Sequence, residues 1–95
     1  MTAGTSYTHI SIDPATCSGL SCIEGTRIRV IDIVALVKRG RTPEEVLDSF
    51  DHLTLSQVHA ALAYYYDHRD EVDRQFEDVR LRAEELVQQH PDLAR

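Results

Sequence analysis

The chain lacks the features of an exported or membrane protein. No apolar run approaches the ~20 residues that a membrane-spanning helix needs. The first residues, MTAGTSYTHISID, contain neither the basic nor the apolar region of a signal peptide. With no export signal, we expect the only two cysteines, Cys17 and Cys22, to be reduced thiols. The 95 residues therefore predict one small cytoplasmic domain with a modest core.

Patterns for catalysis and metal binding are also missing. The sequence has no phosphate-binding loop, no GxGxxG and no HExxH. Cys17 and Cys22 have only His9 as a third candidate ligand, whereas zinc usually takes four. His9 is also the only base near either thiol, and nothing obvious supplies an oxyanion hole. We expect no enzyme activity, no catalytic residue, no metal site and no cofactor.

Positive charge is scarce. Lys and Arg total 10 against 16 Asp and Glu, which gives a formal net charge of −6. Nucleic-acid-binding domains are usually basic, so this balance counts against DNA binding by a monomer. A patch of basic residues still creates a positive electrostatic field around itself. Residues 27–41 contain five bases: Arg27, Arg29, Lys38, Arg39 and Arg41. The alternative interpretation is a solvated surface of mixed charge.

The periodicity of apolar residues predicts a mainly α-helical fold after a short β-ribbon. Residues 7–12 alternate as a short strand does, and two further strands are predicted at 21–24 and 27–30, around a turn at Gly25. From Val30 the apolar spacing becomes i, i+3, i+4, i+7, which is typical of an amphipathic helix.

Two capping boxes predict the next two helices. Thr42 and Glu45 form the first, with Pro43 at the first helical position, and Thr54 and Gln57 form the second. A short helix, a tight turn and a longer helix make a helix-turn-helix arrangement, so residues 30–67 predict a tri-helical unit. The fold alone is weak support for DNA binding, because tri-helical units also serve as packing modules.

A long amphipathic helix is predicted at about 69–90, ending before Pro91. It would be about 33 Å long. It carries one narrow apolar stripe: Val72, Phe76, Val79, Ala83, Leu86 and Val87. Either its first half packs on the core and the rest frays, or the stripe is an interface with a second copy or another protein.

We divide the chain into a flexible N-terminus at 1–6, a β-ribbon plus tri-helical domain at 7–67, and a C-terminal amphipathic helix at 68–95.

Most of the chain resembles a known family. Its residues Ile12-Asp13-Pro14, Cys17-x-Gly19 and Cys22-Ile23-x-Gly25-Thr26-Arg27-Ile28-x-Val30 are similar to the signature of a small prokaryotic family of unknown function, described as VapB-type antitoxin-like. Members resemble homeodomain-like helix-turn-helix proteins. The similarity continues through Gly40-x-Thr42-Pro43-Glu44-Glu45-Val46-Leu47 and Leu53-Thr54-Leu55 to Ala60-Ala61-Leu62-Ala63-Tyr64-Tyr65, and covers roughly residues 8–73. Ser18, Leu20 and Ser21 depart from the family pattern.

The resemblance implies an antitoxin that binds a PIN-like ribonuclease toxin, and operator DNA as a homodimer. In a helix-turn-helix the start of the second helix faces the bases. We therefore expect base contacts from Thr54, Ser56, Gln57 and His59, and phosphate contacts from the five bases of residues 27–41. The apolar stripe is the candidate toxin-binding surface. The alternative is a dimeric protein-interaction module that does not bind DNA.

Overall fold

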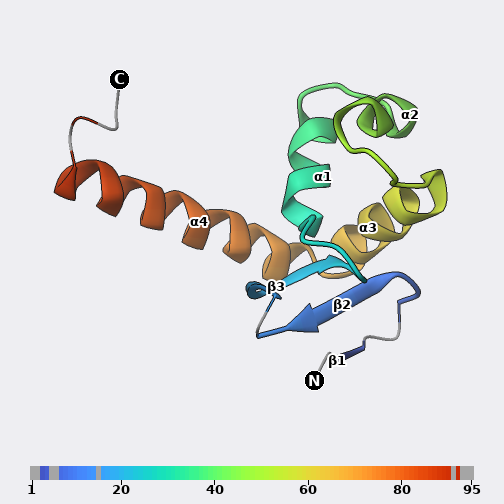
Figure 1. The fold of residues 1–95 in the computed structure, drawn as a ribbon, viewed down its shortest axis with the longest axis horizontal. Coiled ribbons are helices and arrows are strands. Elements are labelled where there is room, and N and C mark those ends of the chain that lie inside the picture. Colours follow the sequence, from blue (N-terminus) through green and yellow to red (C-terminus); the bar gives the residue numbers. More distant parts are fainter. Residues whose placement is uncertain (1–2, 5–6, 15, 91, 93–95) are drawn as a thin grey trace.

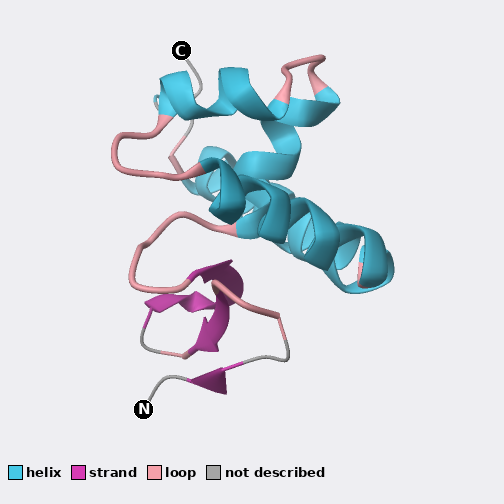
Figure 2. Cartoon of the chain, turned by 90° about the vertical axis from the view of Figure 1, so that its right-hand side faces the viewer, coloured by secondary structure: helices cyan, strands magenta, loops and turns pink. Residues whose placement is uncertain are grey.

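A small sheet underlies a layer of helices, and the last helix projects from both (Figures 1 and 2). The computed structural model describes residues 3–4, 7–14, 16–90 and 92, and describes side chains from Tyr7 to Pro14, from Gly19 to His90, and at Asp92. The principal extents are 40 × 32 × 25 Å. Of the predicted N-terminus at 1–6, Ala3–Gly4 forms strand β1, and the other four residues lie outside the described part.

The sheet is antiparallel, with the strand order β1-β2-β3. Strand β2 (Ile10–Asp13) pairs with β3 (Thr16–Ile23), and Ile10 lies opposite Ile23. The strand predicted at 21–24 is longer and starts earlier, and the strand predicted at 27–30 does not form. Strand β3 begins at Thr16. Residues 27–30 contact it through the Cys22–Arg29 bridge and through the Ile28 carbonyl, which accepts from the Ile23 N–H at 2.8 Å.

A tight turn explains why no third strand forms at residues 27–30. The Thr26 hydroxyl donates to the Ile23 carbonyl at 2.9 Å and accepts from the Ile28 N–H at 3.1 Å. Gly25 supplies the positive φ of +80° that side chains disfavour. The chain therefore enters the first helix directly after the turn.

The predicted helices are confirmed. They are α1 (Val30–Lys38), α2 (Pro43–Val46) with a 3₁₀ turn η1 (Leu47–Ser49), α3 (Leu55–Asp67) and α4 (Arg69–Gln89). Both capping boxes form. The predicted break between the last two helices is also present, at His68, where φ is −132° and ψ is 42°.

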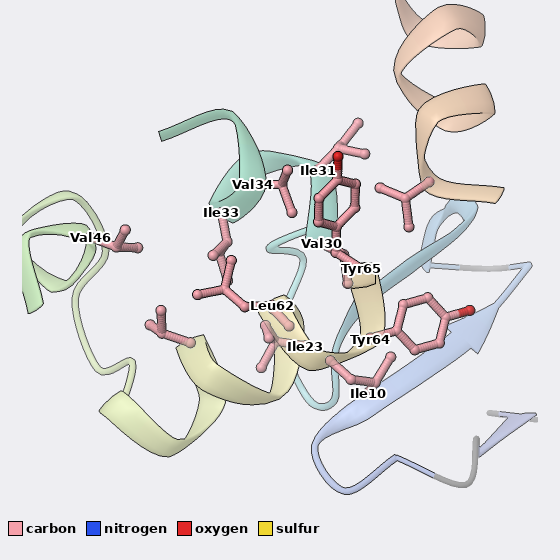
Figure 3. Packing of buried hydrophobic residues seen from close by; sticks show 13 residues of the cluster. Ile10, Ile23, Val30, Ile31, Ile33, Val34, Val46, Leu62, Tyr64 and Tyr65 are labelled. Atoms are coloured by element: carbon pink, nitrogen blue, oxygen red, sulfur yellow. The ribbon is translucent and has the colours of Figure 1, made fainter. Parts of the chain in front are cut away.

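The core lies between the hairpin and the helices (Figure 3). Each of the main elements contributes a side chain that is at most 1% exposed: Ile10 and Ile23 from the hairpin, Ile33 from α1, Val46 from α2, Val58 from α3 and Val72 from α4. Because α4 places only its first turns against this core, its remaining length extends away from the domain (Figure 1).

Candidate functional site

The N-terminal end of α3 carries the four predicted base contacts. Two of them are occupied by capping the helix, since Gln57 Oε1 accepts from the Thr54 N–H at 2.8 Å and Thr54 Oγ1 accepts from the Gln57 N–H at 3.2 Å. Ser56 and His59 are exposed, and neither is a Lys or Arg, the residues that neutralise phosphates. The N-terminal end of α3 is accessible, but it has few side chains of the types that bind nucleic acid.

Two of the five predicted phosphate contacts are engaged within the chain. The Arg29 guanidinium binds both carboxylate oxygens of Asp32, at 2.8 and 3.1 Å. The Lys38 ammonium lies 3.7 Å from the Asp73 carboxylate and 4.8 Å from the centre of the Phe76 ring. Lys38 therefore ties α1 to α4. The other three bases, Arg27, Arg39 and Arg41, are exposed.

The helix-turn-helix unit itself is acidic. Residues 42–67, which include α2 and α3, contain no Lys or Arg but five acidic residues: Glu44, Glu45, Asp48, Asp51 and Asp67. In a DNA-bound helix-turn-helix these two helices lie nearest the phosphates. The charge on this surface would oppose that approach.

A buried hydrogen bond fixes the position of the N-terminal part of α4. The Ser21 hydroxyl, on β3, donates to Gln75 Oε1 at 3.1 Å, and these residues are 0% and 8% exposed. Moving α4 along the sheet would leave both groups unsatisfied, which costs far more than the bond contributes. Sequence spacing could not reveal this contact, because its partners are 54 residues apart and neither belongs to a motif.

Two tyrosines on α3 also hold α4 in position, through hydrogen bonds to acidic residues of α4. Tyr64 donates to Glu71 at 2.6 Å, and Tyr65 donates to Asp73 at 3.4 Å. Burial, followed by the hydrogen bond to Glu71, raises the pKa of Tyr64. Tyr64 therefore stays protonated and keeps donating at physiological pH. His68, at the junction, stacks on the Tyr64 ring with the ring centres 4.2 Å apart.

The apolar stripe is divided between the core and the surface. Val72 is fully buried in the chain's own core, which corrects its prediction as a partner contact. Phe76 and Val79 are half-buried and pack against the core. Beyond them every residue of 80–90 is exposed, including Ala83, and the exposed fractions of Leu86 and Val87 are 53% and 40%. We call residues 80–90 the overhang.

Within the described side chains of the hairpin, Cys22 is a free thiol. Cys22 is 1% exposed and faces Ser11, with Sγ 3.8 Å from the hydroxyl oxygen. The side chain of Cys17 lies outside the described residues. Within the described part of the chain, no group of three His, Cys, Asp or Glu side chains is placed to hold a metal ion.

The overhang and the acidic helix-turn-helix unit are thus two surface features that the described residues of this small helical domain present. A family model described as "Protein of unknown function (DUF433)" matches residues 10–65. The chain belongs to this family. No helix in the described residues is long and apolar enough to cross a bilayer.

A solved structure supports the same assignment. The chain is similar to a DUF433 member protein from Anabaena variabilis, with a TM-score of 0.66 and 34% sequence identity. The match covers 70% of this chain and 66% of that one, slightly less than two thirds of its length. No curated protein matches this chain.

Proposed function

We propose that this protein is an antitoxin-type binding module that neutralises a PIN-like ribonuclease by inserting the overhang of α4 into a groove on it. The observation that carries the proposal is the exposed continuation of the apolar stripe at Ala83, Leu86 and Val87. Helix-in-groove binding uses such anchors at i, i+3, i+4 spacing. The resemblance to VapB-type antitoxins supplies the identity of the partner.

The way α4 is held supports this function. The Ser21–Gln75 bond and the contacts of Lys38 fix the direction of the helix before any partner binds. A preorganised helix loses little conformational freedom on association, which favours affinity. Glu84, at the edge of the stripe, would meet the basic surface with which a ribonuclease binds RNA.

A co-expression experiment tests the proposal. The chain is expressed with the product of the gene next to its own, which the proposal expects to be the ribonuclease, and toxicity and co-purification are measured. Replacing both Leu86 and Val87 with Asp should abolish co-purification and restore toxicity, because two carboxylates would be buried in the groove. Leu81→Asp is the matched control, since Leu81 is 46% exposed but lies on the opposite face of α4.

Two outcomes would contradict the proposal. One is that the Leu86→Asp, Val87→Asp variant still protects and co-purifies with the ribonuclease. The other is that Leu81→Asp is as damaging as the double variant, because protection would then not depend on the face of the helix. Circular dichroism of both variants checks that the overhang remains helical.

DNA recognition through α3 is supported less well than protein binding. Residues 42–67 have five acids and no Lys or Arg, so the chain alone should not retard its own promoter fragment in a gel-shift titration at physiological salt. A specific shift that is lost in Ser56→Ala with His59→Ala would contradict this expectation. Such a result would support DNA binding, and hence a repressor function, by the helix-turn-helix unit.

A further inference from the structure

The side of α3 that is turned away from the core carries no acidic residue and no Lys or Arg. Figure 3 shows the opposite side, where Leu62, Tyr64 and Tyr65 pack into the core. We call the five exposed residues, spaced three or four apart, the outer face: Leu55, Ser56, His59, Ala63 and Tyr66. A helix face in water is normally charged, whereas the centre of a protein interface has few charges and many tyrosines. With Tyr66 60% exposed, the outer face has the composition of an interface.

The charge of α3 is placed at the wrong end for an isolated helix. Backbone dipoles make the N-terminus of a helix positive and its C-terminus negative. Helices α1, α2 and α4 each have an acidic residue in the first turn, whereas α3 has none. The only Asp, Glu, Lys or Arg of α3 is Asp67, at its C-terminal end. Among the described residues, nothing accepts a hydrogen bond from the N–H groups of Leu55 and Ser56. These complementary ends lie about 18 Å apart in one helix, so they can meet only between two copies.

An antiparallel second copy of α3 brings the complementary ends together. In such a pair, positions related through the middle of the helix, near Ala61, lie opposite one another. Asp67 of one copy then lies beside Ser56 of the other, where a hydroxyl and a backbone N–H can donate to the carboxylate. A parallel pair would leave both Asp67 side chains at the same end, far from either N-terminus. The charge complementarity therefore specifies the antiparallel orientation.

The side chains of the outer face also match in size in this orientation. Tyr66 lies opposite Leu55 of the second copy, so the two largest apolar groups of the face are buried together. His59 lies opposite Ala63 of the second copy, so the imidazole ring meets the smallest side chain of the face. Each contact occurs twice, once in each direction, as a twofold interface requires. The outer face is thus complementary to itself.

The surface next to the outer face has room for the rest of a second chain. An open hollow of about 480 Å³ lies at the junction of α3 and α4, lined by residues 66–71 and Arg74. In the antiparallel arrangement this end of α3 meets the loop that precedes α3 in the second copy. His52, in that loop, is exposed and has a φ of 68°. The hollow can accept this loop, so the two helices can approach along their whole length.

We propose that two copies of this chain form a dimer by packing the outer faces of α3 together in antiparallel orientation, about a twofold axis near Ala61. This dimer is independent of the proposed function, because it uses α3 and leaves the overhang of α4 outside the interface. It would also make Ser56 and His59, two of the predicted base contacts, inaccessible to DNA. DNA fits the outer face less well than a second copy does, since residues 42–67 contain five acids and no Lys or Arg.

Disulfide crosslinking of the full-length chain tests the contact and its orientation. A variant with both Leu55→Cys and Tyr66→Cys should form a covalent dimer under mild oxidation. The two positions are about 16 Å apart within one helix, too far for a disulfide, so the bond can form only between copies. Each single substitution is the control, and it should give little covalent dimer, because neither position meets its own equivalent.

Sedimentation equilibrium measures the strength of the dimer. Ala63→Arg should raise its dissociation constant at least about tenfold, because a long charged side chain would be buried at the centre of the contact. Arginine is a good helix former, so circular dichroism should show that the monomer remains folded. The chain with Leu86→Asp and Val87→Asp is the matched control, and it should dimerise as the parent does.

A charge exchange tests the contact between the helix ends. Ser56→Asp should weaken the dimer several-fold, because it would face Asp67 of the second copy. Adding Asp67→Lys in the same chain should recover most of this loss. Within a single helix, an acidic residue near the N-terminus is favourable. A weaker dimer without a less stable monomer therefore separates an effect on the interface from a loss of structure.

Four results would overturn the proposal. One is sedimentation of the parent chain as a monomer throughout the micromolar range. Another is a covalent dimer formed by Leu55→Cys alone, which would make the helices parallel. A dimer that Leu86→Asp with Val87→Asp dissociates, but Ala63→Arg does not, would place the interface on the overhang. A monomer that retards its promoter fragment, and loses this in Ala63→Arg, would make DNA the occupant of the outer face.

Discussion

Val72→Asp is expected to unfold the chain. The Val72 side chain is 0% exposed at the point where α4 meets the core. A carboxylate there would be buried without a partner, at a cost of about 4 kcal/mol or more. Small domains have total stabilities of about 5–15 kcal/mol, so most of the stability would be lost. Urea unfolding followed by circular dichroism measures this, since the chain has no tryptophan for fluorescence.

Ala83→Asp is the matched control for Val72→Asp. Both positions belong to the same stripe of the same helix, but Ala83 lies in the exposed overhang. Its substitution should change the free energy of unfolding by no more than about 0.5 kcal/mol, as is usual for a surface site. Equal destabilisation by the two substitutions would mean that the overhang is packed in solution, against this chain or another copy.

Replacing Phe76 and Val79 together with Ala is expected to destabilise the isolated protein by about 2–3 kcal/mol. Both side chains are half-buried against the core, and the Lys38 ammonium lies over the Phe76 ring. The substitution removes apolar contacts and leaves a cavity, as large-to-small changes in a core do. From the sequence alone, the same double variant would be expected to lose only partner binding and to leave residues 7–67 intact.

Leu86→Ala with Val87→Ala provides the comparison for this second prediction. The pair lies about two and a half turns further along the stripe, where both side chains are exposed. Its free energy of unfolding should stay within about 0.5 kcal/mol of the parent, while partner binding falls. Loss of stability at Leu86 and Val87, or none at Phe76 and Val79, would contradict the division of the stripe that the structure shows.

Local sequence signals determined the helical part of the fold. The capping boxes at Thr42 and Thr54 act over three residues, and each fixes where a helix begins. The apolar period from Val30 onward and the weak helix formers around His68 also act locally, so the helices and the break before α4 could be predicted. The extent of β3 could not, because strand length depends on pairing with β2 rather than on its own small polar residues.

Tertiary structure decided which parts of α4 are available to a partner. The sequence shows one continuous stripe from Val72 to Val87, and nothing in its spacing marks where the core ends. That limit follows from the position of α4 on the hairpin, which the Ser21–Gln75 bond fixes. Tertiary contacts also place Lys38 beside Asp73 and Phe76, which the sequence pattern does not indicate. Periodicity fixes the face of a helix, but burial depends on neighbours distant in sequence, which only the folded chain brings together.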